Sequence, residues 1–519
     1  MNEPFSRRRF LADVGKGTLL ATVGPAFAAE LGIHVPSTTE GSGNTALNFG
    51  KMEELVCFIQ ETPVTKLQPA LLARLRSGTS LQQLVAAGAL ANARTFGGED
   101  YIGFHTLMAL TPAWKMSASL PADQAALPVF KVLYRNTGRI QENGGRADET
   151  LHPVTPATAP ATARELHEAV RSKDAARAEQ LFAKLAEQDK RQAFDALLEC
   201  VEDDTEVHRT VLPYRAWDLM SIVGEEHAHT LLRQSLRYCL QAESRRRPEW
   251  DLHAGVLSRL MDQHKLAGRE AGTGSLDDAA IAELSRIVFS SGPEEAAGAV
   301  AAALAEGRSP GEVGEALSLA ANQLLLRDRG RPPEWEFAGK PTGSVHGDSI
   351  GVHASDSVHA WRNLSGISQG SHKFACLILA AWQIANNRQN SKQPFLNWEP
   401  VPSRRQVNQV AAKEPEALLR ELDAMIRQNL QSHAGAVVER YGALGHSPEP
   451  LFQVLLRYAV SEDGALHAEK YYQTVRDEFQ RTRPSFRWRH LVGLARVTAS
   501  EYGRPAPGQA EARELLAHT

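Results

Sequence analysis

The chain has 519 residues, in which 57 Lys and Arg face 61 Asp and Glu, for a formal net charge of −4. This balance argues against a nucleic-acid-binding surface. Its four cysteines have no CxxC or CxxCH spacing, which disfavours a thiolate zinc site and attached c-type haem.

The first 28 residues have the pattern of an export signal. Residues 6–11 (SRRRFL) precede a weakly apolar stretch that ends in 26–28 (AFA). This resembles a twin-arginine signal with a small-x-small cleavage site; an ordinary Sec signal is the alternative. The resemblance implies export to the periplasm or beyond by the twin-arginine translocation machinery, which carries folded proteins and so favours a bound cofactor. An oxidising compartment permits a Cys200–Cys239 disulfide, but both cysteines lie in helical patterns, so buried free thiols are favoured.

Helical periodicity dominates the rest of the chain. Apolar residues recur three and four apart in 181–198, 279–288, 294–304, 417–426 and 450–460, and alternating strand patterns are nearly absent. We therefore predict an all-α fold of repeated helical hairpins, packed as a multi-helix array or toroid-like bundle. After the signal no apolar run is long enough for a membrane span. The predicted modules are 29–145, 164–265, 266–390 with 327–351 as a loop insertion, and 391–519, with a linker at 146–163.

A degenerate repeat connects these modules. His105 and His208 each precede the Trp of an Ala-Trp pair by nine residues, and His353 does so by eight. The aromatics Tyr134, Tyr238 and Trp382 follow those tryptophans by 20, 21 and 21 residues, and His467 begins a fourth, more worn copy. The serines at 80, 309 and 447 are predicted helix N-caps. If the copies pack around a common axis, the four imidazoles meet in one cavity.

Two acidic residues stand three positions before a histidine, so that each pair can share a helix face. These are Glu226 with His229 and Asp356 with His359. A carboxylate with an imidazole suits iron or another divalent metal. The candidate metal ligands are His105, His208, Glu226, His229, His353, Asp356 and His359, and the candidate catalytic residues are His353, His359, His105 and His208. Tyr134, Tyr214 and Trp361 are expected to line a pocket for a small-molecule ligand. Helix capping and core packing are the alternative roles for these side chains.

Missing motifs narrow the chemistry. HExxH and the P-loop pattern do not occur, and neither GxSxG match, at 347–351 and 366–370, follows a strand. No glycine-rich turn follows a strand either, which disfavours a Rossmann site and makes flavin or NADPH less favoured cofactors than a metal.

Residues 105–141, 208–240 and 353–386 resemble the questin oxidase-like family, most closely at 353–362 (HASDSVHAWR). The resemblance implies an all-helical fold and, as in fungal members, a Baeyer–Villiger-type oxidative ring opening of an anthraquinone that uses reduced nicotinamide. The export signal and the 327–351 insertion depart from the family, and NADPH is not available outside the cytoplasm. Because ground-state dioxygen reacts slowly with closed-shell molecules, a histidine-rich iron or copper site is the simpler source of oxidation chemistry.

Three functions remain open from the sequence. The first is an exported oxidoreductase that acts on a cyclic or aromatic small molecule at a histidine-rich metal site. The second is a non-catalytic helical-repeat protein that binds a partner. The third is a metal-binding protein without turnover.

Overall fold

The computed structural model describes residues 46–247, 250–336 and 340–518. Within these ranges the chain forms 23 α-helices joined by turns and short 3-10 helices, and its only β-pairing is two isolated bridges, Gly274 with Arg308 and Glu462 with Pro505. The all-α prediction is therefore confirmed. The predicted signal at 1–28 lies outside the described residues.

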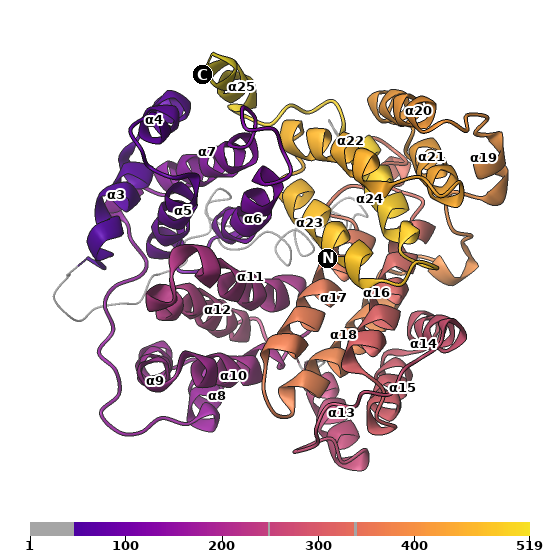
Figure 1. Cartoon of the computed structure of the whole chain (residues 1–519). Helices are drawn as coiled ribbons and strands as arrows, with labels where there is room; N and C mark the ends of the chain where they lie inside the picture. The colour runs from indigo at the N-terminus through magenta and orange to yellow at the C-terminus, as the bar shows by residue number, and fades with distance from the viewer. Residues whose placement is uncertain (1–45, 248–249, 337–339, 519) are drawn as a thin grey trace, which may run out of the picture.

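The helices follow one another around a centre in four groups (Figure 1). The first group is α3 (Glu53–Glu61), α4 (Val64–Arg76), α5 (Leu81–Phe96), α6 (Tyr101–Ser117) and α7 (Leu127–Glu142). The second is α8 (Ala163–Arg171), α9 (Ala175–Gln188), α10 (Lys190–Val201), α11 (Val207–Val223) and α12 (Ala228–Glu243). The third is α13 (Trp250–Gln263), α14 (Asp278–Ser290), α15 (Pro293–Ala305), α16 (Pro310–Arg327), α17 (Ile350–Ile367) and α18 (His372–Asn390). The fourth is α19 (Arg404–Gln409), α20 (Pro415–Arg427), α21 (Gln431–Ala443), α22 (Pro448–Ser461), α23 (His467–Arg481) and α24 (Trp488–Glu501), after which α25 (Gln509–Ala517) ends the chain.

The ring closes between its first and last groups. Helix α25 packs against α4 and α7, and α23 packs against α6. A buried ion pair joins the same groups, because Lys131 Nζ of α7 lies 2.6 Å from Glu469 Oε1 of α23. The array is thus toroid-like in its connectivity, with the last helix of the described chain packed against the first helix group.

One helix of each group faces the centre, and these inner helices are α6, α11, α17 and α23. Each contacts the next, and α23 contacts α6. Pairs of contacts show that they run parallel. His105 of α6 contacts His208 of α11, and ten residues later in both helices Lys115 contacts Asp218. His208 also contacts His353 of α17, and six residues later in both helices Tyr214 contacts His359. The beginnings of all four inner helices therefore meet at one level.

Local sequence explains where the helices begin. Ser80 caps α5 in a full capping box with Gln83, as its position predicts. Ser309 and Ser447 also occupy N-cap positions, but there the next residue is proline and the serine side chain makes no capping bond. At α11 the cap is Glu206, which accepts hydrogen bonds from the backbone N–H groups of His208 and Arg209.

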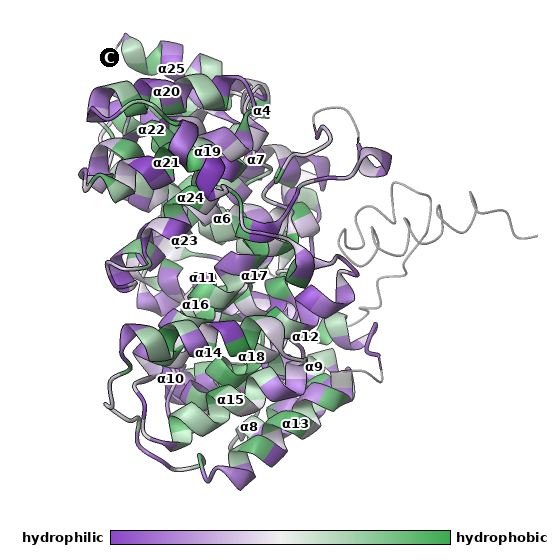
Figure 2. Ribbon diagram, turned by 90° about the vertical axis from the view of Figure 1, so that its right-hand side faces the viewer, coloured by the Kyte–Doolittle hydropathy of each residue, from purple (hydrophilic) through white to green (hydrophobic). Residues whose placement is uncertain are grey.

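Packing of apolar faces holds the array together. Polar and apolar residues alternate around the individual helices when the molecule is seen from the side (Figure 2), whereas the inner helices are buried over most of their length. In the described ranges no helix is long and apolar enough to cross a membrane. All four cysteines lie in these ranges as free thiols, and those at 200, 239 and 376 are buried.

Candidate functional site

Four histidines, one from each inner helix, meet at the centre of the ring. His105 and His208 face each other with their Nε2 atoms 3.3 Å apart, and His353 and His467 do the same at 3.3 Å. The ring centroids of successive members are 4.8, 6.1, 5.4 and 5.2 Å apart around the circuit. We call these four residues the histidine cluster. His353 is half-buried and the other three are buried.

Oxygen acceptors determine which nitrogens of the first pair carry protons. His105 Nδ1 lies 2.7 Å from the Tyr101 carbonyl oxygen, and His208 Nδ1 lies 2.6 Å from Glu206 Oε1. Both oxygens only accept, so both Nδ1 atoms must donate. In the neutral imidazoles the two Nε2 atoms then carry lone pairs that point at each other, an arrangement that a cation between them would stabilise.

The spacing within each pair is that of metal ligands. Two nitrogens bound at about 2.0–2.1 Å to one tetrahedral ion are about 3.3 Å apart. In the described part of the chain, no group of three or more His, Cys, Asp or Glu side chains stands ready to hold a metal ion. The cluster therefore consists of two ligand-like pairs rather than one closed ligand set.

Three members of the cluster, His105, His353 and His467, lie in an environment that favours the neutral imidazole. Burial lowers the pKa of His353 to about 4, and the nearby Lys470 ammonium acts in the same direction. Burial and the Lys470 ammonium hold the pKa values of His105 and His467 well below the ordinary range. Burial also lowers the pKa of Lys470 itself to about 8. Neutral imidazoles can bind a metal without first releasing a proton.

Glu206 is the carboxylate that supports the cluster. Burial raises its pKa, but hydrogen bonds from the His208 side chain, from Tyr238 and from the α11 backbone bring the pKa down to about 2. The Tyr238 hydroxyl donates to Glu206 Oε2 over 2.7 Å. Tyr101 and Phe104 complete an aromatic wall, with ring centroids 4.4 and 5.1 Å from that of His105.

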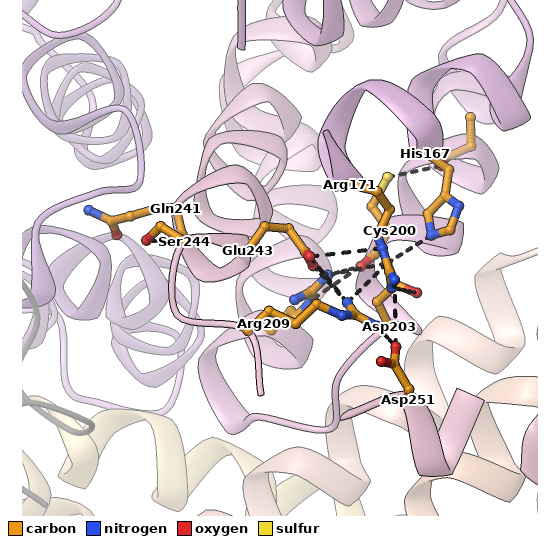
Figure 3. Close-up of polar contacts among 11 residues, drawn as sticks. His167, Arg171, Cys200, Asp203, Arg209, Gln241, Glu243, Ser244 and Asp251 are labelled. Carbon is orange, nitrogen blue, oxygen red and sulfur yellow. Dashed lines mark hydrogen bonds and ion pairs between the residues drawn. The ribbon is translucent and has the colours of Figure 1, made fainter. Parts of the chain in front are cut away.

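A buried ionic network anchors the first turn of α11 beside His208 (Figure 3). The fully buried Arg209 guanidinium donates through Nε to the Cys200 carbonyl oxygen over 3.0 Å and lies 3.3 Å from Glu243 Oε1. Asp203 accepts from His167 Nε2 at 2.8 Å and lies 3.5 Å from Arg171. The network joins α8, α10, α11 and α12, so it fixes the position from which His208 projects.

The segment before α17 covers the cluster. Gly347 packs so tightly on His467 that a Cβ at 347 would lie 2.3 Å from the His467 Cβ, so only glycine fits. The Gly347 N–H donates to Glu501 Oε1 over 2.9 Å, and the Val345 N–H donates to Ser500 Oγ over 2.9 Å. Burial raises the pKa of Glu501 to about 7. This tight cover belongs to the predicted 327–351 insertion.

A second polar layer lies about 9 Å further along the inner helices, six residues at 1.5 Å each. His359 is its centre. Its Nδ1 lies 2.9 Å from Glu478 Oε1, and its Nε2 lies 3.4 Å from both Asp477 Oδ2 and the Tyr214 hydroxyl. Arg362 pairs with Glu478 on the other side, and the charge of that guanidinium with the contact to His359 holds the pKa of Glu478 low against the effect of burial.

The remaining candidate ligands lie outside the histidine cluster. Asp356 is buried between the two layers, where it accepts a hydrogen bond from Thr474 over 2.8 Å and burial raises its pKa. Glu226 is exposed in a 3-10 turn (Glu225–His227), and His229 belongs to the following helix α12, where its ring lies 5.7 Å from that of Phe182. The expected shared helix face of that pair is therefore interrupted by the start of α12.

The three aromatics expected in a pocket are separated. Trp361 is fully buried and its indole N–H donates to Gln383 over 2.8 Å, which is a core-packing role. Tyr134 lies against Gly508 in the connection to α25. Tyr214 is buried against His359 in the second layer.

Sequence reasoning recognised His467 as the fourth repeat member but left it out of the ligand set. Glu206 and Lys470 were not singled out at all. Glu206 has one usable signal, an acidic N-cap two residues before a repeat histidine. No sequence signal marks Lys470, because its burial depends on how α23 packs against the other helices.

No family model, curated protein or solved structure matches this chain.

Proposed function

We propose that the histidine cluster binds one divalent metal ion through its Nε2 atoms, and that the protein is a metal-dependent oxidoreductase acting on a small cyclic or aromatic molecule. The observation that carries the metal site is the pair of 3.3 Å Nε2–Nε2 contacts, in one of which both Nδ1 protons are committed to oxygen acceptors. Binding would draw the two pairs into one ligand set.

The donor set indicates which metals fit. Four imidazole nitrogens suit iron, copper, nickel or zinc, whereas magnesium and calcium prefer oxygen ligands. Glu206 supports His208 through Nδ1 rather than offering the metal an oxygen, the usual arrangement of a carboxylate behind a metal-binding histidine. Iron, the metal that the sequence favours, is one of the metals that fit these ligands. The carboxylates expected to bind it, Glu226 and Asp356, lie outside the cluster.

A bound iron or copper ion would supply the one-electron chemistry that dioxygen needs. The chain's own residues do the remaining work. Glu206 and the Tyr101 carbonyl orient the imidazoles, the rings of Tyr101 and Phe104 pack against His105, and the segment around Gly347 covers His467. His353, the half-buried member, marks the side from which a ligand enters.

Two sequence features support the oxidoreductase part of the proposal. The first is the resemblance to the questin oxidase-like family, carried by the segments that hold His105, His208 and His353. The second is the twin-arginine pattern, which we propose sends the folded, metal-loaded protein to the periplasm. A metal-binding protein without turnover shares the cluster, and a helical-repeat binding protein needs no metal at all.

The first test is the metal content of the protein purified without chelators, measured by plasma mass spectrometry. About one equivalent of a transition metal is expected. His105→Gln and His467→Gln should each remove most of it, while His229→Gln, which changes a histidine outside the cluster, should keep it. Metal retained in both cluster variants, or absent from the wild type after reconstitution with iron, copper and zinc, would contradict the proposal.

Dioxygen consumption distinguishes an enzyme from a metal-binding protein without turnover. The metal-loaded protein should consume dioxygen faster when phenolic or quinone compounds are added, and His353→Gln should abolish the increase. Stoichiometric metal with no stimulated consumption across a broad panel of such compounds would favour the protein without turnover.

A further inference from the structure

A groove of about 1150 Å³ opens on the surface where α17 and α23 end and α16 begins. Its walls come from the first turns of α16, the end of α17, the start of α18 and the turn that follows α23. It is separate from the histidine cluster, none of whose members lines it. The volume is slightly above the range of small-molecule sites, which hold roughly 300–1,000 Å³.

The groove is lined by more cations than anions. Five basic residues line it, namely Arg362, Lys373, Arg481, Arg483 and Arg487. The acidic residues are three, Asp278, Glu312 and Glu315.

One arginine contacts all three acids. Arg483 lies 2.9 Å from Asp278, 3.1 Å from Glu315 and 3.8 Å from Glu312. Arg362 is likewise committed, since it pairs with Glu478 behind the wall. The acids therefore pair with Arg483 rather than with the other basic side chains, and across the whole lining the five cations exceed the three anions by two charges.

Three cations remain without a carboxylate partner in the described part of the chain. Arg481 is exposed and donates only to the amide oxygen of Asn363, at 3.0 Å. The Arg487 guanidinium stacks on Phe479 with its Cζ 4.8 Å from the ring centroid, and its Nε is buried without a hydrogen-bond partner. Lys373, half-buried at the start of α18, completes the set.

We infer that this groove binds a small molecule that carries two or more oxyanion groups, phosphate or carboxylate. Several like charges around one concavity repel each other and raise the local concentration of anions. Guanidinium groups match the geometry of both oxyanions. Because all three cations lack a carboxylate partner, a ligand with several anionic groups can pair with more of them than a ligand with a single charge.

Isothermal titration of the full chain at constant ionic strength tests this inference. The probes are fructose 1,6-bisphosphate, tricarballylate and, as the uncharged control, fructose. We expect saturable one-to-one binding of at least one charged probe and none of fructose. A tighter bisphosphate indicates a phosphorylated ligand, and a tighter tricarballylate a polycarboxylate.

Matched variants locate the binding. Lys373→Gln with Arg481→Gln should weaken binding at least tenfold, and both positions are accessible enough to tolerate the change. Arg286→Gln removes an exposed arginine that pairs with Glu283 on α14, and it should leave affinity unchanged. His105→Gln should also bind normally, so a failure of the metal site does not affect this result. No saturable binding of either charged probe, or equal weakening by Arg286→Gln, would overturn the inference.

Discussion

At the scale of single residues, Glu206 joins structure to chemistry. One of its carboxylate oxygens caps α11 and accepts from Tyr238, and the other accepts the Nδ1 proton of His208. The same side chain therefore starts an inner helix and fixes the imidazole tautomer that the proposed metal site needs.

Replacing Glu206 by Gln should lower metal affinity about 10- to 100-fold, the usual effect of losing an outer partner of a metal-binding histidine. The amide still accepts through its oxygen, so helix α11 should form. Competition with a chromophoric chelator measures the affinity. Tyr238→Phe, which removes only the hydroxyl on the other oxygen, should change it less than threefold. If Glu206→Gln and the wild type bind the metal with equal affinity, Glu206 does not support metal binding.

At the scale of elements, the turn between α17 and α18 is tied to α10. His372 Nδ1 lies 2.7 Å from Glu202, the Gln369 N–H donates to Asp195, and Arg191 donates to the Ile367 carbonyl. Although burial lowers the pKa of His372, its bond to Glu202 and the nearby acids raise it to about 9. The pair thus holds the second helix group to the third while His372 is protonated.

Because the folded pKa of His372 is above the unfolded value, its stabilisation is complete below pH 6.5 and is lost as the pH rises through about 9. His372→Gln should therefore lose about 2–3 kcal/mol at pH 6 and almost nothing at pH 10. Unfolding by urea at both pH values measures this. His446→Gln, which changes a half-buried histidine bonded to a backbone carbonyl, should show no such difference. An equal loss at both pH values would mean that the pair does not act through charge.

At the scale of the whole molecule, ring closure makes the histidine cluster possible. His467 reaches His105 only because the last helix group returns to the first, and Lys131 holds these groups together. Its ammonium lies 2.6 Å from Glu469 and donates to the carbonyl oxygens of Ala459 and Glu462. Both members of the ion pair are almost fully buried.

Lys131→Met should destabilise the protein by about 3–5 kcal/mol, because it leaves the Glu469 carboxylate buried without its partner. It should also lower the metal content, since α7 no longer holds α23 in place. Adding Glu469→Gln should restore part of the stability. Calorimetry and metal analysis on the same samples test both effects; a variant that melts like wild type would show that the pair does not hold the ring closed.

The sequence predicts much of the fold, because its signals are local. Apolar spacing gives the helices, and Ser80 gives the start of α5. The site is harder. Asp356 and His359 look like ligands because they lie one turn apart on the helix that carries His353 near its start. They instead lie deeper along α17, since residues three and six positions after His353 are about 4.5 and 9 Å away along the axis.

The sequence by itself determined that the protein is helical, that a histidine-bearing unit recurs four times, and that each copy places its histidine near a helix start. These properties depend on residues a few positions apart. Only the tertiary structure decided that the four helices run parallel around a closed ring, that His467 meets His353 while Glu206 supports His208, and that three cations share one groove. Those contacts join residues up to hundreds of positions apart, and they depend on packing between faces that no local pattern records.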